Sequence, residues 1–177
     1  MIAKKHIFFI IFACWAVIIM AFIGYKQYTL SSGTKILLKT APVDPRDVLR
    51  GDYVVLSYEI SRLDLSEINA NSLQFSGGDT AFVILEKGEK YWAPSGISKD
   101  RPSADVIFIK GDVTSAYGTY LSMRYGIENY FVPEGKGSEI EQYIRRGSTL
   151  DVEVSVDEFG NSVISGLYAN GTEIRLK

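Results

Sequence analysis

The sequence predicts a mainly β domain, either a β-sandwich or a partly open antiparallel barrel with one or two short helices, carried on one N-terminal transmembrane helix. An uncharged apolar run lies within the first 25 residues. Short segments rich in β-branched and aromatic residues follow, separated by Gly, Pro, Asn or Ser, which is typical of strands joined by turns. The 177 residues fit a single domain of ordinary size.

The N-terminal segment is predicted to cross a membrane. Residues 7–23 read IFFIIFACWAVIIMAFI without a charge, and a helix over residues 7–25 is about 28 Å long. A cleavable signal peptide is the alternative, but the run ends without the small-x-small pattern of a cleavage site. Because short basic tails usually stay inside, we expect a cytoplasmic tail (1–6), a single-pass anchor in the cytoplasmic membrane (7–25), a juxtamembrane linker (26–33) and one extracytoplasmic domain (34–177).

The rest of the chain reads as a succession of strands. We expect them at residues 34–40, 53–60, 80–86, 105–109, 119–125, 150–156, 163–168 and 172–176. The Asn170-Gly171 pair predicts a tight hairpin within a C-terminal meander. A capping box at Ser138 and Glu141 predicts a helix over 138–146, and a weaker pattern favours one over 65–73.

The segment 150–156 is the clearest of these strands. Apolar and polar residues alternate along it, as in a strand with one buried and one solvated face. We therefore expect Leu150, Val152, Val154 and Val156 in the core, and Asp151, Glu153 and Ser155 in solvent.

Charge and composition exclude several classes of function. Without Lys4 and Lys5, 17 basic residues face 21 acidic ones, so the domain has a formal charge of −4, which argues against nucleic acid and against a polybasic lipid clamp. The only histidine, His6, precedes the anchor and the only cysteine, Cys14, lies inside it. We therefore expect no catalytic residue, no metal and no cofactor in the folded domain, because most hydrolase and metal sites use imidazole or thiol groups.

The segment APVDPRDVLRGDYVVLSYEI, residues 41–60, combines a stiff bend with a strand. Pro42 and Pro45 restrict the bend, and the strand would place Val54, Leu56, Tyr58 and Ile60 on one apolar face. The flank is densely charged, with Asp44, Arg46, Asp47, Arg50, Asp52 and Glu59. These charges could form a binding surface, or Asp52 could simply cap the bend while Tyr58 is one more buried aromatic residue.

Two blocks of the sequence resemble a known family. GDYVVLSY, residues 51–58, matches the pattern that names the GDYXXLXY family of bacterial membrane-anchored proteins, and RYGIENYFVPEGKG, residues 124–137, is similar to its other characteristic stretch. The motif residues are Gly51, Asp52, Tyr53, Leu56 and Tyr58. The resemblance implies no reaction, because the family is uncharacterised. It implies a partner within the membrane, because its members tend to be encoded beside multi-span membrane proteins.

We therefore predict an accessory protein whose β domain docks on a polytopic membrane or envelope partner. The candidate binding residues are Asp44, Arg46, Asp47, Arg50, Asp52, Tyr53, Arg124, Glu128 and Lys136. One alternative is a hydrolase resembling signal peptidases, with Lys110 and Ser31 or Ser32, although the usual sequence contexts are absent. The other is an envelope-glycan reader that uses exposed aromatic side chains, whereas we expect burial for Tyr117, Tyr120, Tyr125, Tyr130 and Phe131.

Overall fold

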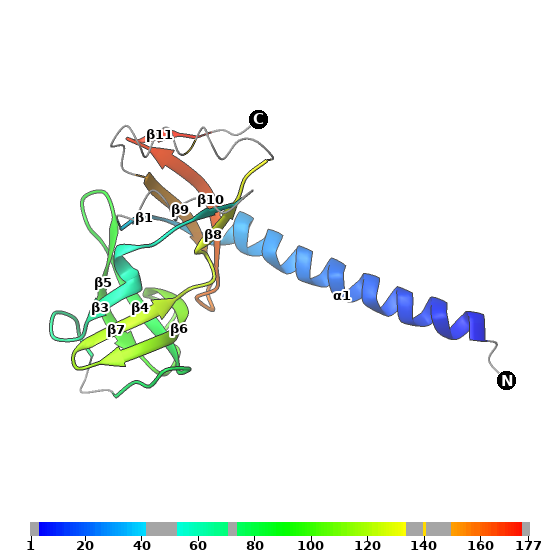
Figure 1. Ribbon diagram of the computed structural model, residues 1–177, viewed down its shortest axis with the longest axis horizontal. Coiled ribbons are helices and arrows are strands. Elements are labelled where there is room, and N and C mark those ends of the chain that lie inside the picture. Colours follow the sequence, from blue (N-terminus) through cyan, green and yellow to red (C-terminus); the bar gives the residue numbers. More distant parts are fainter. Residues whose placement is uncertain (1–3, 42–52, 71–73, 134–139, 141–149, 175–177) are drawn as a thin grey trace.

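A computed structural model describes residues 4–41, 53–70, 74–133, 140 and 150–174. One long helix, α1 (Lys4–Ser32), projects from a β-rich head (Figure 1). The predicted fold class is confirmed, because the strands of the head form antiparallel sheets that curve into a partly open barrel.

Helix α1 is long and apolar enough to span a membrane. Its large apolar side chains from Ile7 to Ile23 each expose 48% to 72% of their surface, which is costly in water. The predicted juxtamembrane linker, 26–33, is helical as far as Ser32. It contains no proline, and its last turns bond to the head, so tertiary contacts extend the helix beyond the apolar run.

The first sheet has the strand order β1-β9-β10-β11. Its strands are β1 (Thr34–Lys39), β9 (Leu150–Val156), β10 (Ser162–Ala169) and β11 (Thr172–Glu173). The predicted hairpin is confirmed, since Asn170 and Gly171 have φ values of 50° and 80° between the last two strands. Of the strand expected at 172–176, residues 175 and 176 lie outside the described residues.

Strand β9 is one of the two inner strands of this sheet, and its predicted apolar face is buried. The solvated face was wrongly predicted for Asp151 and Ser155, both of which are 0% exposed. The end of α1 covers Ser155, and the turn between β4 and β5 covers Asp151 through Lys90 and Tyr91. Neither cover is visible in the alternation of the strand itself.

The second sheet has the order β3-β7-β6-β4-β5. Its strands are β3 (Arg62–Asp64), β4 (Thr80–Lys87), β5 (Trp92–Ser98), β6 (Ile107–Tyr117) and β7 (Tyr120–Arg124). Sequence patterning missed β5, which contains Pro94 and Gly96. An edge strand tolerates proline because one side of it needs no backbone donor.

The third element is a ribbon of two short strands, β2 (Tyr53–Val55) and β8 (Asn129–Phe131). The strand expected over 53–60 ends at Val55, and a 3-10 turn, η1 (Glu59–Ser61), replaces its last part. The helix expected over 65–73 is a turn in its described part, with the Asp64 carboxylate accepting from the Ser66 amide at 3.0 Å. The helix predicted over 138–146 lies outside the described residues except Ile140, which is helical and fully buried.

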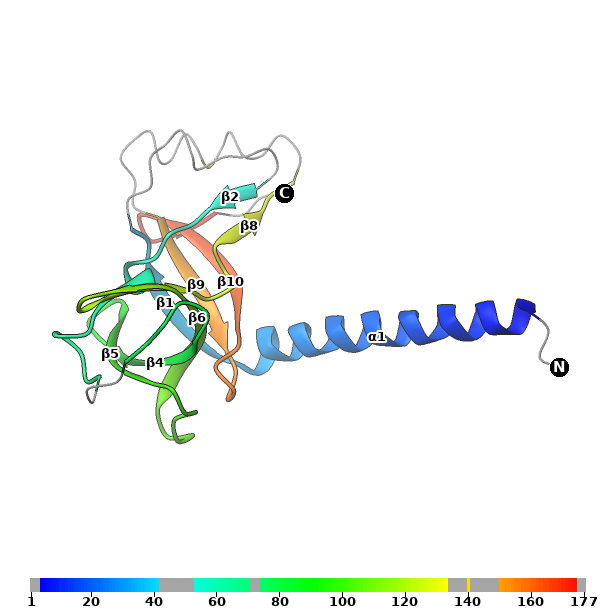
Figure 2. The same cartoon turned by 60° about the horizontal axis from the view of Figure 1, so that its bottom comes forward.

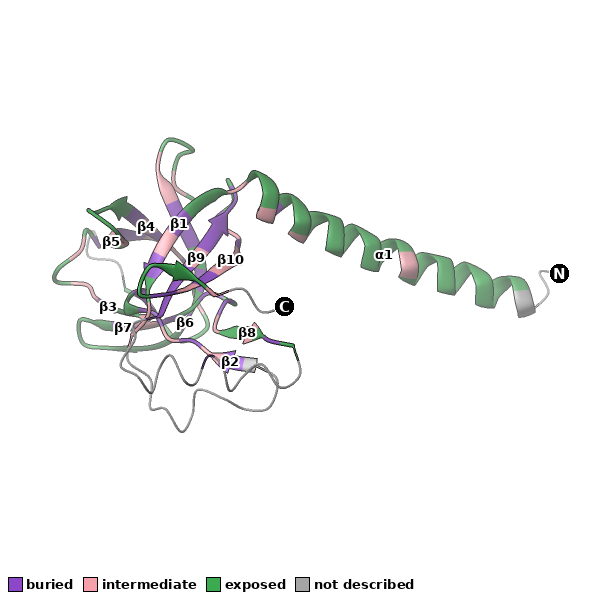
Figure 3. Ribbon diagram, turned by 90° about the horizontal axis from the view of Figure 1, so that it is seen from above, coloured by how far each residue is buried: buried purple, intermediate pink, exposed green. Residues whose placement is uncertain are grey.

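The core fills the space enclosed by the sheets. Figure 3 shows buried residues along the inner strands and exposed residues along almost all of α1. The expected inward face of the motif strand is confirmed, because the exposed fractions of Val54, Leu56, Tyr58 and Ile60 lie between 0% and 4%.

Candidate functional site: the motif ribbon and the helix junction

The two blocks that carry the family resemblance meet in space. Tyr53 pairs with Phe131, Val54 with Tyr130 and Val55 with Asn129 in an antiparallel register. We call residues 53–58 together with 125–131 the motif ribbon. Figures 1 and 2 show its paired strands on the side of the head from which α1 leaves.

A reciprocal pair of tyrosines joins the two halves of the motif ribbon to each other and to the core. The Tyr58 hydroxyl donates to the Ile127 carbonyl at 2.6 Å, and the Tyr125 hydroxyl donates to the Ile60 carbonyl at 2.6 Å. The Leu56 amide also donates to the Glu128 carbonyl at 2.7 Å. Each block therefore supplies one buried tyrosine donor: Tyr58 bonds to the other block, and Tyr125 bonds to Ile60, two residues beyond the first block.

Both tyrosines are held in their neutral form. Burial, and secondarily the negative charge of Glu128, raises the pKa of Tyr58 and of Tyr125 far above the ordinary phenol value. A neutral phenol keeps its proton and remains a hydrogen-bond donor. The two tyrosines thus have a structural role, because their hydrogen bonds hold the two segments of the motif together.

Glu128 stabilises the turn before β8. Its carboxylate accepts from the Tyr125 amide at 2.6 Å and from the Gly126 amide at 2.9 Å. Gly126 has a φ of 79°, a conformation that suits glycine. This predicted binding residue is therefore engaged locally by backbone groups.

The other predicted binding residues are placed as follows. Arg124 is exposed at the end of β7, where it lines a cavity that also receives Lys26 from α1 and Lys110 from β6. Tyr53 belongs to β2. The remaining candidates lie outside the described residues; they are Asp44, Arg46, Asp47, Arg50, Asp52 and Lys136, together with Gly51 of the motif.

The junction between α1 and the head is built on Asp157, which is 8% exposed in the turn after β9. One of its carboxylate oxygens accepts from the Tyr25 and Thr29 hydroxyls, each at 3.0 Å. The other accepts from the Phe159 and Asn161 amides, each at 2.9 Å. Helix and head are thus bonded to the same carboxylate.

Further contacts tighten this junction. The Ser155 hydroxyl donates to the Thr29 carbonyl at 2.7 Å, and Thr29 is 0% exposed. A methyl group at Gly33 would lie 2.5 Å from the Ser155 hydroxyl oxygen, so only glycine fits at this approach. Burial pushes the pKa of Asp157 upward, but the hydrogen bonds from Asn161, Tyr25 and Phe159 outweigh it, and the net pKa is lowered.

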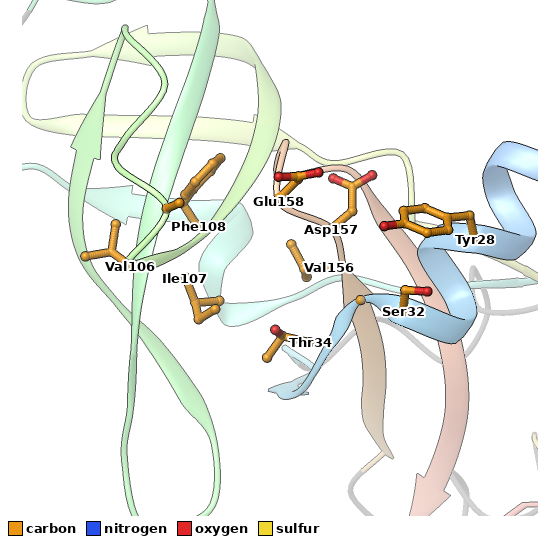
Figure 4. A pocket seen from close by; sticks show the side chains of 11 residues that line it. Tyr28, Ser32, Thr34, Val106, Ile107, Phe108, Val156, Asp157 and Glu158 are labelled. Carbon is orange, nitrogen blue, oxygen red and sulfur yellow. The ribbon is translucent and has the colours of Figure 1, made fainter.

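A cavity of about 200 Å³ lies beside this junction. Figure 4 shows Tyr28 and Ser32 of α1 on one side of it and Val106, Ile107 and Phe108 on another. Asp157 and Glu158 complete the polar part of its wall. Sequence patterning did not find this cavity, because its walls come from three distant segments.

The aromatic side chains near β6 and β7 are divided between core and surface. Tyr125 is buried as expected, and Tyr130 is half-buried. Burial was wrongly predicted for the others, since Tyr117, Tyr120 and Phe131 expose 87%, 55% and 77% of their surface. Tyr117 and Tyr120 face each other across a two-residue turn, where the chain has to reverse and no other described element covers them.

The described residues contain no group of three or more His, Cys, Asp or Glu side chains that could hold a metal ion. The alternative Ser-Lys pairing also lacks geometric support. Lys110 and Ser32 line different cavities, and the Ser31 hydroxyl donates to the Gln27 carbonyl of its own helix at 2.9 Å.

Comparison with known families bears on the motif ribbon. The family described as GDYXXLXY protein matches residues 15–167, which is most of the chain. The chain belongs to this family. No curated protein and no solved structure matches it. Within the GDYXXLXY motif, the described positions Leu56 and Tyr58 are core residues, so at least this half of the pattern has a structural explanation.

Proposed function

We propose that the protein is a single-pass membrane-anchored accessory protein, and that its extracytoplasmic head binds a polytopic partner in the same membrane. The observation that carries this proposal is the junction at Asp157. An unbroken helix bonded through Tyr25 and Thr29 gives the head a fixed height and orientation above the bilayer. A fixed orientation favours one lateral face, which suits a partner in the membrane plane.

The motif ribbon is the proposed docking face. It lies on the same side of the head as α1 (Figures 1 and 2), and Phe131 exposes 77% of its surface there. Exposed aromatic side chains are frequent anchors of protein interfaces. The described part of the head offers no histidine or cysteine, which supports binding rather than catalysis.

The partner test uses a photo-crosslinking phenylalanine analogue at position 131, with position 117 as the matched control. Both native side chains are exposed aromatics, but Tyr117 ends β6 at its turn into β7, in the second sheet and outside the motif ribbon. We expect a crosslink to a polytopic membrane protein from position 131 only, weakened by Asp52→Ala or Tyr53→Ala. Equal crosslinking from both positions would contradict a docking face on the motif ribbon.

Membrane topology is tested separately. We expect a cysteine placed at exposed Lys87, in a Cys14→Ala background, to react with a membrane-impermeant maleimide in intact cells whose outer layers are permeable to the reagent. The Cys14→Ala chain alone is the control. Labelling only after cell lysis would place the head in the cytoplasm.

An envelope glycan is a second candidate partner, supported by the exposed tyrosine pair. Tyr117 and Tyr120 line a shallow hollow of about 460 Å³ with Arg62, Ser115 and Ser122. Flat aromatic faces beside polar groups suit sugar rings. In this case Tyr117→Ala would abolish co-sedimentation with purified cell wall, whereas Phe131→Ala would not.

A further inference from the structure

Building on the membrane anchoring proposed above, we propose that three cations at the foot of the head bind the phosphate of an anionic phospholipid. They are Lys26 on α1, close to where this helix meets the head, Lys110 on β6 and Arg124 on β7. All three line one cavity of about 290 Å³. Liquid water occupies about 30 Å³ per molecule, so this cavity has room for a phosphate group and some of its hydration.

The sheet and the helix bring these cations together from distant parts of the chain. Lys110 and Asp112 are two residues apart on β6 and therefore share one face of the sheet. Arg124 is the register partner of Asp112 on the neighbouring strand, so its side chain emerges on the same face. Lys26 approaches this face from α1, which the Asp157 junction holds in place.

None of the three cations is paired with another described residue. Within the described residues, Lys26, Lys110 and Arg124 form no ion pair and no side-chain hydrogen bond, whereas Lys35, Lys39, Lys90 and Lys99 each pair with a carboxylate. Among the described residues that line the cavity, Asp112 is the single acidic one. The wall therefore has an excess of two positive charges, which favours an anion.

The position of Lys26 identifies a lipid as the source of that anion. It directly follows Tyr25, at the end of the uncharged run that spans the bilayer, and so lies at the depth of the headgroups. Basic side chains at this depth extend toward lipid phosphates. Arg124 adds a fork of donors that fits phosphate oxygens.

This site is compatible with the negative charge of the whole domain. A formal charge of −4 over the head describes the average surface and opposes a broad basic clamp. A headgroup site needs only a few cations within one Debye length, which is about 8 Å at physiological ionic strength. The net charge of the sequence does not reveal a local cluster of this kind.

The two sides of α1 are chemically different at this level. Successive helix residues are rotated by about 100°, so Tyr28 lies on the opposite side of the helix from Lys26. The cavity beside Tyr28 is lined by Asp157 and Glu158. The anionic headgroup is therefore expected on the Lys26 side only.

The test measures lipid retention by native mass spectrometry of the full chain in detergent, with phosphatidylglycerol, phosphatidylcholine or inorganic phosphate added. We expect retention of one phosphatidylglycerol and little phosphatidylcholine. Lys110→Gln and Arg124→Gln should each weaken retention about fivefold, as expected for loss of one basic contact near an anionic lipid. Lys87→Gln, an exposed lysine on β4, is the matched control and should change nothing.

Three outcomes would overturn the proposal. Equal retention of phosphatidylglycerol and phosphatidylcholine would show that lipid charge plays no role. If the chain instead bound inorganic phosphate, showed no preference between the lipids, and lost phosphate in the Lys110→Gln and Arg124→Gln variants, the ligand would be a free anion. If the variants do not fold, the wild-type chain decides, because retention that is unchanged at high salt contradicts a phosphate site. Loss of lipid from Lys110→Gln with an intact crosslink at position 131 keeps this site separate from the proposed docking face.

Discussion

Replacing Tyr58 with phenylalanine removes one hydroxyl group and tests whether the last residue of the family motif is structural. The hydroxyl donates to the Ile127 carbonyl at 2.6 Å in a region where Tyr58 is 1% exposed. Without it, that carbonyl is left buried and unpaired, which costs about 1–3 kcal/mol of unfolding free energy. Tyr125→Phe removes the reciprocal bond to the Ile60 carbonyl and should cost the same.

The two tyrosines also test each other. If both hydroxyl groups hold the same two segments together, the first substitution already loosens the contact that the second would break. The double variant should then lose less unfolding free energy than the sum of the two single variants. Tyr117→Phe is the control, because this side chain is 87% exposed. We expect the control to change stability by less than about 0.5 kcal/mol.

The assay is urea unfolding of the full chain in detergent, followed by the fluorescence of Trp92 on β5. Trp15 on α1 is replaced with phenylalanine in every variant, so that the signal reports the head alone. Unfolding midpoints for Tyr58→Phe and Tyr125→Phe equal to that of the control would refute a structural role for the tyrosine pair. The motif would then have to be explained by binding.

Other predictions concern the junction and the buried charge. Gly33→Ala places a methyl 2.5 Å from backbone and side-chain oxygens and should cost about 1–3 kcal/mol, whereas Gly24→Ala meets nothing within 4 Å and should be neutral in the same urea assay. Because the pKa of Asp157 is lowered in the folded state, its stabilisation is present above the unfolded value of about 3.9 and is lost as pH falls through the folded value. Asp157→Asn should therefore be less stable than wild type at pH 7, and the gap should close in acid, as measured by urea midpoints; an unchanged gap would contradict this. Lys90→Met leaves the fully buried Asp151 without its cation and should destabilise the head, whereas Lys90→Arg should not, as thermal unfolding followed by circular dichroism would show.

Local patterns predicted the parts of the fold that depend on local physics. The alternation of β9 correctly assigned its apolar face, and the Asn170-Gly171 pair correctly placed the last hairpin. The prediction that Asp151 faces solvent was wrong, because the turn that covers it, with Lys90 and Tyr91, lies 60 or more residues away in the sequence. Strand β5 was missed because Pro94 argues against a strand, and only the edge position of β5 makes it acceptable.

The candidate sites were less predictable, because they are properties of topology. Arg124 was singled out in the sequence, but nothing there indicates that Lys26 and Lys110 share its cavity. The pairing of Tyr53 with Phe131 is equally invisible, since a three-residue strand has too short a pattern to select a partner. The chemistry of single residues could be predicted from the sequence, whereas the meeting of residues from distant segments at one site could not.

The junction at Asp157 makes the remaining features depend on one another. Because α1 is bonded to the turn after β9, a rotation of the helix turns the head with it. In the proposed membrane-anchored protein, the Lys26 cavity and the motif ribbon would then keep fixed directions relative to the bilayer, and a headgroup held in the cavity would fix the lateral direction of the ribbon. Breaking the junction should therefore weaken the crosslink from position 131 even though no residue of the motif ribbon is altered, and Gly33→Ala compared with Gly24→Ala provides that experiment. An unchanged crosslink in Gly33→Ala would show that the partner recognises the ribbon without help from its orientation.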